Sequence, residues 1–150
     1  MMNLFDRVRV PFHLQSIEEE GYHILVDAVI NKQPARLLID TGASRSVFDT
    51  NRFSRFVEAH EFRPDEKLSA GLGTSSMQTM KVTLTELRIG ECSIPGFETI
   101  LLDMSHVNSS YERLGLPQLD GVVGSELLVL LEAQIDYRKR QLVIKTRVGK

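Results

Sequence analysis

The chain has a single cysteine, Cys92, so no disulfide can form within it. No export signal is expected, because Met1–Arg7 lack an apolar stretch and carry an acid where a signal peptide is basic. The longest uninterrupted apolar run, Leu127–Leu131, is far below the roughly 20 residues needed to cross a bilayer. These absences predict a soluble, cytoplasmic protein with no membrane partner.

Neither sign of charge dominates, since 18 Lys and Arg stand against 20 Asp and Glu, for a formal net charge of −2. A general nucleic-acid binder draws its affinity from a basic excess, so no nucleic-acid partner is expected. The chain also lacks repeats, low-complexity tracts and linkers rich in proline, glycine and serine. Its length and its 42% of hydrophobic residues predict a single domain over residues 1–150.

Several signatures of catalysis and cofactor binding are missing as well. The 4 histidines are scattered without His-x-x-x-His spacing and have one cysteine beside them, which is not a zinc-binding pattern. No Gly-x-x-x-x-Gly-Lys-Ser/Thr loop and no Gly-x-Ser-x-Gly elbow occurs, which excludes phosphate-loop enzymes and serine hydrolases of that type. Neither a metal nor another cofactor is therefore predicted.

The pattern of apolar residues predicts a mainly β chain. Strands are expected at Val8–Leu14, Tyr22–Ile30, Ala35–Asp40, Met77–Ile89, Ile94–Leu102, Gly121–Gly124, Ala133–Tyr137 and Gln141–Thr146. Pro11 indicates an edge strand or a strand start, and residues 31–34 form the turn of a predicted hairpin. Many strands joined by turns favour a barrel-like sheet over a parallel α/β layer.

Two short helices are expected among these strands. Asp49–His60 places Phe53, Phe56 and Val57 on one helical face, and Asp49 or Thr50 could serve as its N-cap. Ser125–Glu132 has Ser125 in reach as its N-cap. Residues 105–117 are predicted to be a loop with one helical turn, which Asn108 or Ser109 would cap.

The strongest local signal for chemistry is an apolar strand that runs directly into a carboxylate. The segment is Leu37-Leu38-Ile39-Asp40-Thr41-Gly42-Ala43-Ser44. A carboxylate at the end of a buried strand costs desolvation free energy unless it is hydrogen-bonded or used in chemistry. Gly42 lets the backbone turn sharply beside Asp40, and Thr41 supplies a hydroxyl that can hold the loop. Taken alone, the tripeptide is equally compatible with an ordinary Asp-Thr-Gly turn.

Two further segments follow this one along the chain. A glycine-containing stretch, Ser69–Ser76, precedes a strand and has the composition of a mobile hairpin tip. Further on, Asp120–Leu128 is a buried two-valine strand that ends in Gly124 and enters a helix.

In this order, and over roughly Ile24 to Ile144, the three segments resemble the half-domain of the retropepsin-like aspartic peptidases. The resemblance implies a mainly β half-barrel of the acid-protease fold, in which residues 122–124 lie beside the Asp40 loop. The chain departs from the viral pattern where Ser125 and Glu126 replace an Arg followed by Asn or Asp. Its segment 103–119 is also longer than a compact viral half-domain needs.

A single Asp-Thr-Gly has a consequence for assembly. Metal-free peptide hydrolysis can use one ionised carboxylate to take a proton from water and one protonated carboxyl to donate to the carbonyl oxygen. Two carboxylates about 3 Å apart share a proton and titrate as a unit. Since neither Asp120-Gly121 nor Asp136-Tyr137 has the Thr-Gly context, either a two-fold homodimer supplies two copies of Asp40 or there is no catalytic pair.

The first hypothesis is a homodimeric aspartic endopeptidase acting on a peptide or protein substrate. In it Asp40, Thr41 and Gly42 form the catalytic loop, and the substrate-binding residues are Ala43, Gly71, Leu72, Gly73 and Thr74. The alternative is a peptide-binding or assembly module that keeps the same fold without turnover. The intact Asp-Thr-Gly-Ala weighs against the alternative, and the altered Ser125-Glu126 pair weighs slightly for it.

Overall fold

The computed structural model describes residues 7–19, 21–57, 63–64 and 80–148. The strands are β1 (Arg7–Pro11), β2 (His13–Ser16), β3 (Tyr22–Ile30), β4 (Gln33–Ile39), β5 (Val47–Asp49), β6 (Arg63–Pro64), β7 (Met80–Ile89), β8 (Cys92–Leu102), β9 (Gly121–Val123), β10 (Gln134–Asp136) and β11 (Gln141–Lys145). Helices α2 (Ser105–Arg113) and α3 (Ser125–Leu130) lie among them.

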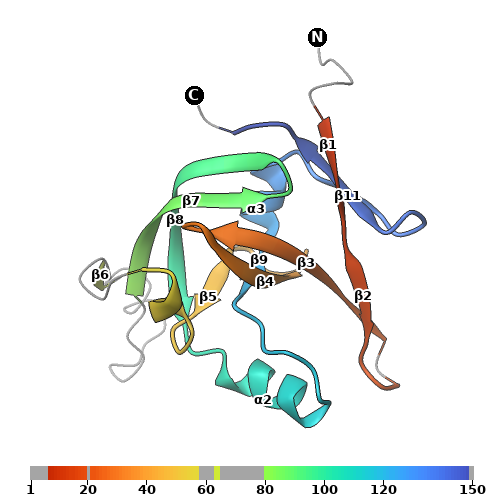
Figure 1. Cartoon of the computed structure of the whole chain (residues 1–150). Helices are drawn as coiled ribbons and strands as arrows, with labels where there is room; N and C mark the ends of the chain where they lie inside the picture. Colours follow the sequence, from red (N-terminus) through yellow and green to blue (C-terminus); the bar gives the residue numbers. More distant parts are fainter. Residues whose placement is uncertain (1–6, 20, 58–62, 65–79, 149–150) are drawn as a thin grey trace.

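The strands form two sheets, which Figure 1 shows meeting along the long course of β1 and β2. The larger sheet has the order β2-β3-β4-β9-β5-β8-β7-β6, and a further pairing of β3 with β7 curls it into a barrel. The smaller sheet has the order β1-β11-β10. This arrangement confirms the predicted mainly β, barrel-like fold. It also has two short helices, of which α3 lies where a helix was predicted and α2 does not.

The hairpin of β3 and β4 carries the chain into Asp40. Ile30 pairs with Gln33, so the connection is the two-residue turn Asn31-Lys32, whose φ angles of 48° and 70° are both positive. A turn of this kind matches the right-handed twist of its two strands and fixes their register. The register in turn places Leu37 and Ile39 on the core face, because side chains alternate along a strand. The predicted hairpin is confirmed.

Two apolar clusters cover the two faces of this hairpin. Val26 belongs to the larger cluster, inside the barrel, while its neighbour Leu25 belongs to a smaller one on the other face. In the smaller cluster Leu25 packs with Met104, Tyr111, Leu119 and Val122. Helix α2 and the segment that follows it therefore cover the outer face of the sheet next to the Asp40 loop.

The predicted strand Val8–Leu14 is divided in two by Phe12. Its first part, β1, pairs with β11 at the edge of the smaller sheet, and its second part, β2, pairs with β3 in the larger one. Pro11 is the last residue of β1, an edge strand, so the N–H that proline lacks is not needed for a hydrogen bond inside the sheet. This agrees with the prediction of an edge strand at Pro11.

The helix predicted over Asp49–His60 is wrong for its described part, up to residue 57. Asp49 ends strand β5, and only a single 3-10 turn, Phe53–Arg55, follows it. Phe53, Phe56 and Val57 are nevertheless buried on one side, as their spacing predicted. Asp49 Oδ1 does accept the N–H of Asn51 at 3.1 Å, as a cap would, but no α-helix follows, and the same carboxylate accepts from the Met104 backbone and the Asn108 side chain.

The predicted loop 105–117 is instead largely helical, and the predicted caps are wrong. Met104 precedes α2, while Asn108 is buried within that helix. The Asn108 side chain binds both the N–H and the C=O of Leu119, at 2.7 Å and 3.0 Å, which ties the helix to the segment before β9. For α3 the residue in the N-cap position is Gly124 rather than Ser125, and no side chain caps it.

No helix in the described part of the chain is long and apolar enough to span a membrane. The predicted hairpin tip, including Gly71, Leu72, Gly73 and Thr74, lies outside the described residues.

Candidate active site

The loop after β4 holds the Asp40 carboxylate in a defined orientation. Asp40 continues the strand by donating its N–H to the carbonyl of Val123 at 2.9 Å. Its Oδ1 accepts the N–H of Gly42 at 2.9 Å, and its own carbonyl accepts the N–H of Ala43 at 3.1 Å. The chain thus folds back around the carboxylate, and Asp40, Thr41 and Gly42 are all exposed. The expectation of a buried carboxylate is therefore wrong for the single chain, because burial along β4 ends at Ile39.

Strand β9 and the start of α3 pack against this loop and hold it by backbone hydrogen bonds. β4 and β9 run parallel, with Ile39 opposite Val123, and the Ser125 N–H donates to the Ala43 carbonyl at 2.7 Å. Gly124 lies so close that a Cβ on it would stand 2.5 Å from the carbonyl carbon of Arg45 and 2.9 Å from the carbonyl oxygen of Ala43. The predicted placement of residues 122–124 beside the Asp40 loop is confirmed.

The carboxylate of Glu126 fastens the far end of the loop at Ser46. Its two oxygens lie 2.9 Å and 2.7 Å from the Ser46 backbone nitrogen, and the Ser46 hydroxyl donates to Oε1 at 2.9 Å. The same hydroxyl accepts the N–H of Gly124 at 2.8 Å. Because Ser46 is fully buried, these bonds are shielded from competing water. Glu126, which departs from the viral pattern, therefore has a definite partner in this chain.

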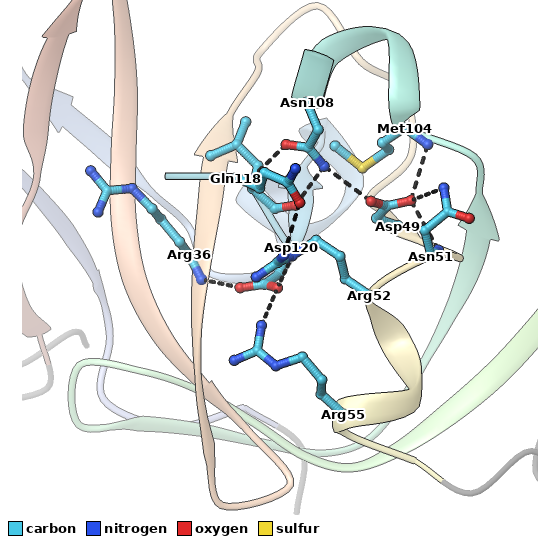
Figure 2. Close-up of polar contacts among 10 residues, drawn as sticks. Arg36, Asp49, Asn51, Arg52, Arg55, Met104, Asn108, Gln118 and Asp120 are labelled. Atoms are coloured by element: carbon cyan, nitrogen blue, oxygen red, sulfur yellow. Dashed lines mark hydrogen bonds and ion pairs between the residues drawn. The ribbon is translucent and has the colours of Figure 1, made fainter. Parts of the chain in front are cut away.

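Two other carboxylates of this half of the sheet, Asp120 and Asp49, are buried, and Figure 2 shows their hydrogen bonds and ion pairs. Asp120 accepts the backbone N–H of Arg36 at 2.8 Å and pairs with the side chains of Arg52 and Arg55 at 2.9 Å and 3.1 Å. Asp49 accepts from Asn51, Met104 and Asn108. Both carboxylates therefore hold the fold together through these contacts. Asp40 differs from them because it is exposed and no described side chain donates to it.

A pocket of about 250 Å³ opens beside Asp40. It is lined by Tyr22, His23, Ile24, Leu38, Ile39, Asp40, Thr41 and Tyr137. Tyr22 and Tyr137 are 68% and 62% exposed and lie at its rim, where the Tyr137 ring also packs edge-on against Phe12, with 6.1 Å between the ring centroids. The His23 ring is held in place by α2, since its Nδ1 lies 2.7 Å from the Tyr111 hydroxyl.

The structure brings together Asp40, Thr41, Gly42 and Ala43, the described members of the predicted site. Ala43 is half-buried and packs against the smaller apolar cluster. Tyr22, His23 and Tyr137 were not predicted as site residues. Only the β2–β3 turn and the β10–β11 hairpin bring them to Asp40, and no local motif marks them. Among the described residues no group of three or more His, Cys, Asp or Glu side chains is arranged to hold a metal ion.

Comparison with known proteins gives a family and several similar folds. The family model described as aspartyl protease matches residues 26–127. A retropepsin-like aspartic protease from Rickettsia conorii superposes with a TM-score of 0.54 and 16% identity, covering 92% of this chain and 87% of that one. The retroviral protease-like domain of Ddi1 from Leishmania major gives 0.57 and 17%, covering 83% and 86%.

The EIAV protease, in complex with an inhibitor, gives a TM-score of 0.53 and 18% identity, covering 79% of this chain and 97% of that one. At these identities the likeness shows a shared retropepsin-like fold. No curated protein matches the sequence.

Proposed function

Because the chain belongs to the aspartyl protease family, we propose that it is an aspartic endopeptidase that works as a homodimer. The observation that carries this proposal is the exposed Asp40 carboxylate, oriented by the Gly42 amide on a loop that β9 and α3 hold in place. A peptide bound in the pocket beside Asp40 would meet this carboxylate directly.

The proposed mechanism uses Asp40 from each of two subunits around one water molecule. The ionised carboxylate takes a proton from the water, and the water oxygen attacks the peptide carbonyl carbon. The protonated carboxyl of the other subunit donates its proton to the carbonyl oxygen. The carboxyl that took the proton from water then gives it to the amide nitrogen, the C–N bond breaks, and the carbonyl re-forms as its hydroxyl proton returns to the other carboxylate. In each subunit the Gly42 N–H orients its Asp40 carboxylate, and Thr41 would brace the two loops against each other.

An assay with a library of fluorogenic peptides, from about pH 4 to pH 7, tests the proposal. We expect cleavage of internal peptide bonds that is lost in Asp40→Asn. Peptide binding without cleavage by the dimer would contradict it and favour the alternative, a peptide-binding or assembly module.

The surface proposed for the second subunit lies on the side of α3 and β10. Among the described strands, β10 is at the edge of the smaller sheet and pairs on one side alone, with β11. Three large apolar side chains are exposed near it, namely Val129 at 75%, Leu130 at 39% and Tyr137 at 62%. Since Tyr137 also lines the Asp40 pocket, a subunit bound here lies next to the site it must complete.

We expect Val129→Asp to weaken dimerisation at least tenfold, because a two-fold axis places the two new charges near each other. Sedimentation at micromolar concentration measures the change, and Ser109→Asp, on the exposed face of α2, is the matched control. A wild-type protein that sediments only as a 17.0 kDa species with full activity would refute the homodimer.

Replacing Glu126 with glutamine should lower kcat/KM about tenfold, a barrier change of about 1.4 kcal/mol. The amide has one acceptor oxygen where the carboxylate has two, and its NH2 group faces the Ser46 N–H. The loop that carries Asp40 then loses its fixed end, so kcat should fall more than KM rises. Ser125→Ala is the control, since Ser125 holds Ala43 through its backbone alone. Equal kinetics in the two variants would show that Glu126 does not position the loop.

A further inference from the structure

Arg36, in the middle of β4, has a guanidinium group without a hydrogen-bond acceptor among the described residues. Its Nε is fully buried and unpartnered, although its backbone N–H is bound by Asp120. Figure 2 shows the side chain extending away from Asp120, Arg52 and Arg55, toward the opposite side of β4. A buried donor without a partner costs about 1–3 kcal/mol, and more when the group is charged, so the described residues leave this guanidinium short of an acceptor.

Arg36 lines a pocket of about 390 Å³ on the outer face of the sheet. The lining residues are Pro11, Phe12, His13, Leu25, Asp27 and Arg36. This volume is near the lower end of the range of about 300–1,000 Å³ for small-molecule sites, which favours a small ligand. Arg36 lies four residues before Asp40 on the same strand, a rise of about 13 Å, so this pocket is separate from the candidate active site.

The pocket carries one charge of each sign. Asp27 on β3 is directly opposite Arg36 in the register of the hairpin, which places their Cβ atoms about 4.5–5.5 Å apart. The two charged groups nevertheless form no ion pair within 4.0 Å, and Asp27 is exposed. The other titratable group of the lining, His13, is exposed and bonded to Gln15 through its Nε2. Within the described part of the chain, a cation and an anion thus both lack a partner at one small pocket, where the other lining residues include the apolar Pro11, Phe12 and Leu25.

We propose that this pocket binds a free α-amino acid in its zwitterionic form. The α-carboxylate accepts from the Arg36 guanidinium, the α-ammonium donates to the Asp27 carboxylate, and an apolar side chain rests against Leu25 and Phe12. An anion alone would meet repulsion from Asp27, and a cation alone would meet repulsion from Arg36. Charge-assisted hydrogen bonds at both ends distinguish the zwitterion from either singly charged analogue.

The side-chain Nε–Hε signal of Arg36 in a nitrogen–proton correlation spectrum tests the proposal directly. Titration with L-leucine is compared with 4-methylpentanoate, which has only the carboxylate, and 3-methylbutylamine, which has only the ammonium group. We expect leucine to shift this signal and the backbone amides of Leu25 and Asp27, with a Kd of about 1 mM or below. Leucine should bind at least tenfold more tightly than either analogue.

Variants separate the two contacts. Arg36→Gln should weaken leucine binding at least tenfold, while Arg9→Gln, at an exposed arginine of β1, should leave it unchanged. Asp27→Asn, at an exposed position, should weaken leucine binding and strengthen that of 4-methylpentanoate. Absence of any shift up to about 50 mM leucine, or equal binding of leucine and 4-methylpentanoate, would overturn the proposal. None of these measurements depends on peptidase activity.

Discussion

Asp40→Asn is expected to lower kcat/KM for peptide hydrolysis by about 10³-fold or more, within the range for loss of a general acid–base group. Asparagine keeps the volume of the side chain, and its oxygen can still accept the Gly42 N–H, so the loop keeps its shape. It cannot take a proton from water, and in a dimer it removes both members of the proposed pair. Because Asp40 is exposed, the melting temperature should stay within about 2 °C of wild type.

Asp120→Asn is the matched control for that result. This carboxylate is 5% exposed and pairs with two arginines, so its loss leaves buried groups without a partner. We expect a loss of about 2–3 kcal/mol of stability, less than the usual 3–5 kcal/mol for a buried pair because Arg55 reaches solvent. The folded fraction should still cleave peptide. Full activity in Asp40→Asn would show that Asp40 is not catalytic.

The parts of the fold that the sequence predicted are those with local causes. Alternating apolar residues and a short turn specify the β3–β4 hairpin without help from distant residues. Asp-Thr-Gly likewise specifies the sharp loop that follows. The mistaken helix at Asp49–His60 shows the opposite case. Its apolar spacing was correct, but Asp49 is held by Met104 and Asn108, more than fifty residues away, and these contacts favour a strand end.

The candidate site likewise has residues that a local motif predicts and residues that only the fold brings in. Asp40 to Ala43 form one continuous loop, and a motif identified them. Tyr22 and Tyr137 join the pocket from two distant turns, and Glu126 gained a role only when the fold brought Ser46 to it. The sequence showed that Glu126 departs from the viral pattern, but the identity of its partner depends on a contact across 80 residues.

Gly124 links the Asp40 loop to the rest of the barrel, so Gly124→Ala should damage both stability and activity. The added Cβ would stand 2.5 Å from the carbonyl carbon and 2.7 Å from the carbonyl oxygen of Arg45. These are backbone atoms, which cannot rotate aside as a side chain can, so the whole loop must move. Overpacking of this kind costs about 1–3 kcal/mol, and the rigid neighbours place Gly124→Ala near the upper end. At about 2–4 °C per kcal/mol, the melting temperature should fall by roughly 6–12 °C.

The movement forced by Gly124→Ala also acts on Asp40, because the loop is held by two bonds at this point: the Gly124 N–H donates to the Ser46 hydroxyl, and the Ser125 N–H donates to the Ala43 carbonyl. We expect kcat/KM, measured well below the melting temperature and corrected for the folded fraction, to fall at least tenfold, or about 1.4 kcal/mol in barrier. Ser125→Ala, one residue along the chain, adds no atom near the Arg45 backbone. It should leave the melting temperature and kcat/KM near their wild-type values. If Gly124→Ala lost stability but kept full activity per folded molecule, the Asp40 loop would tolerate displacement, and its support by β9 and α3 would not be part of catalysis.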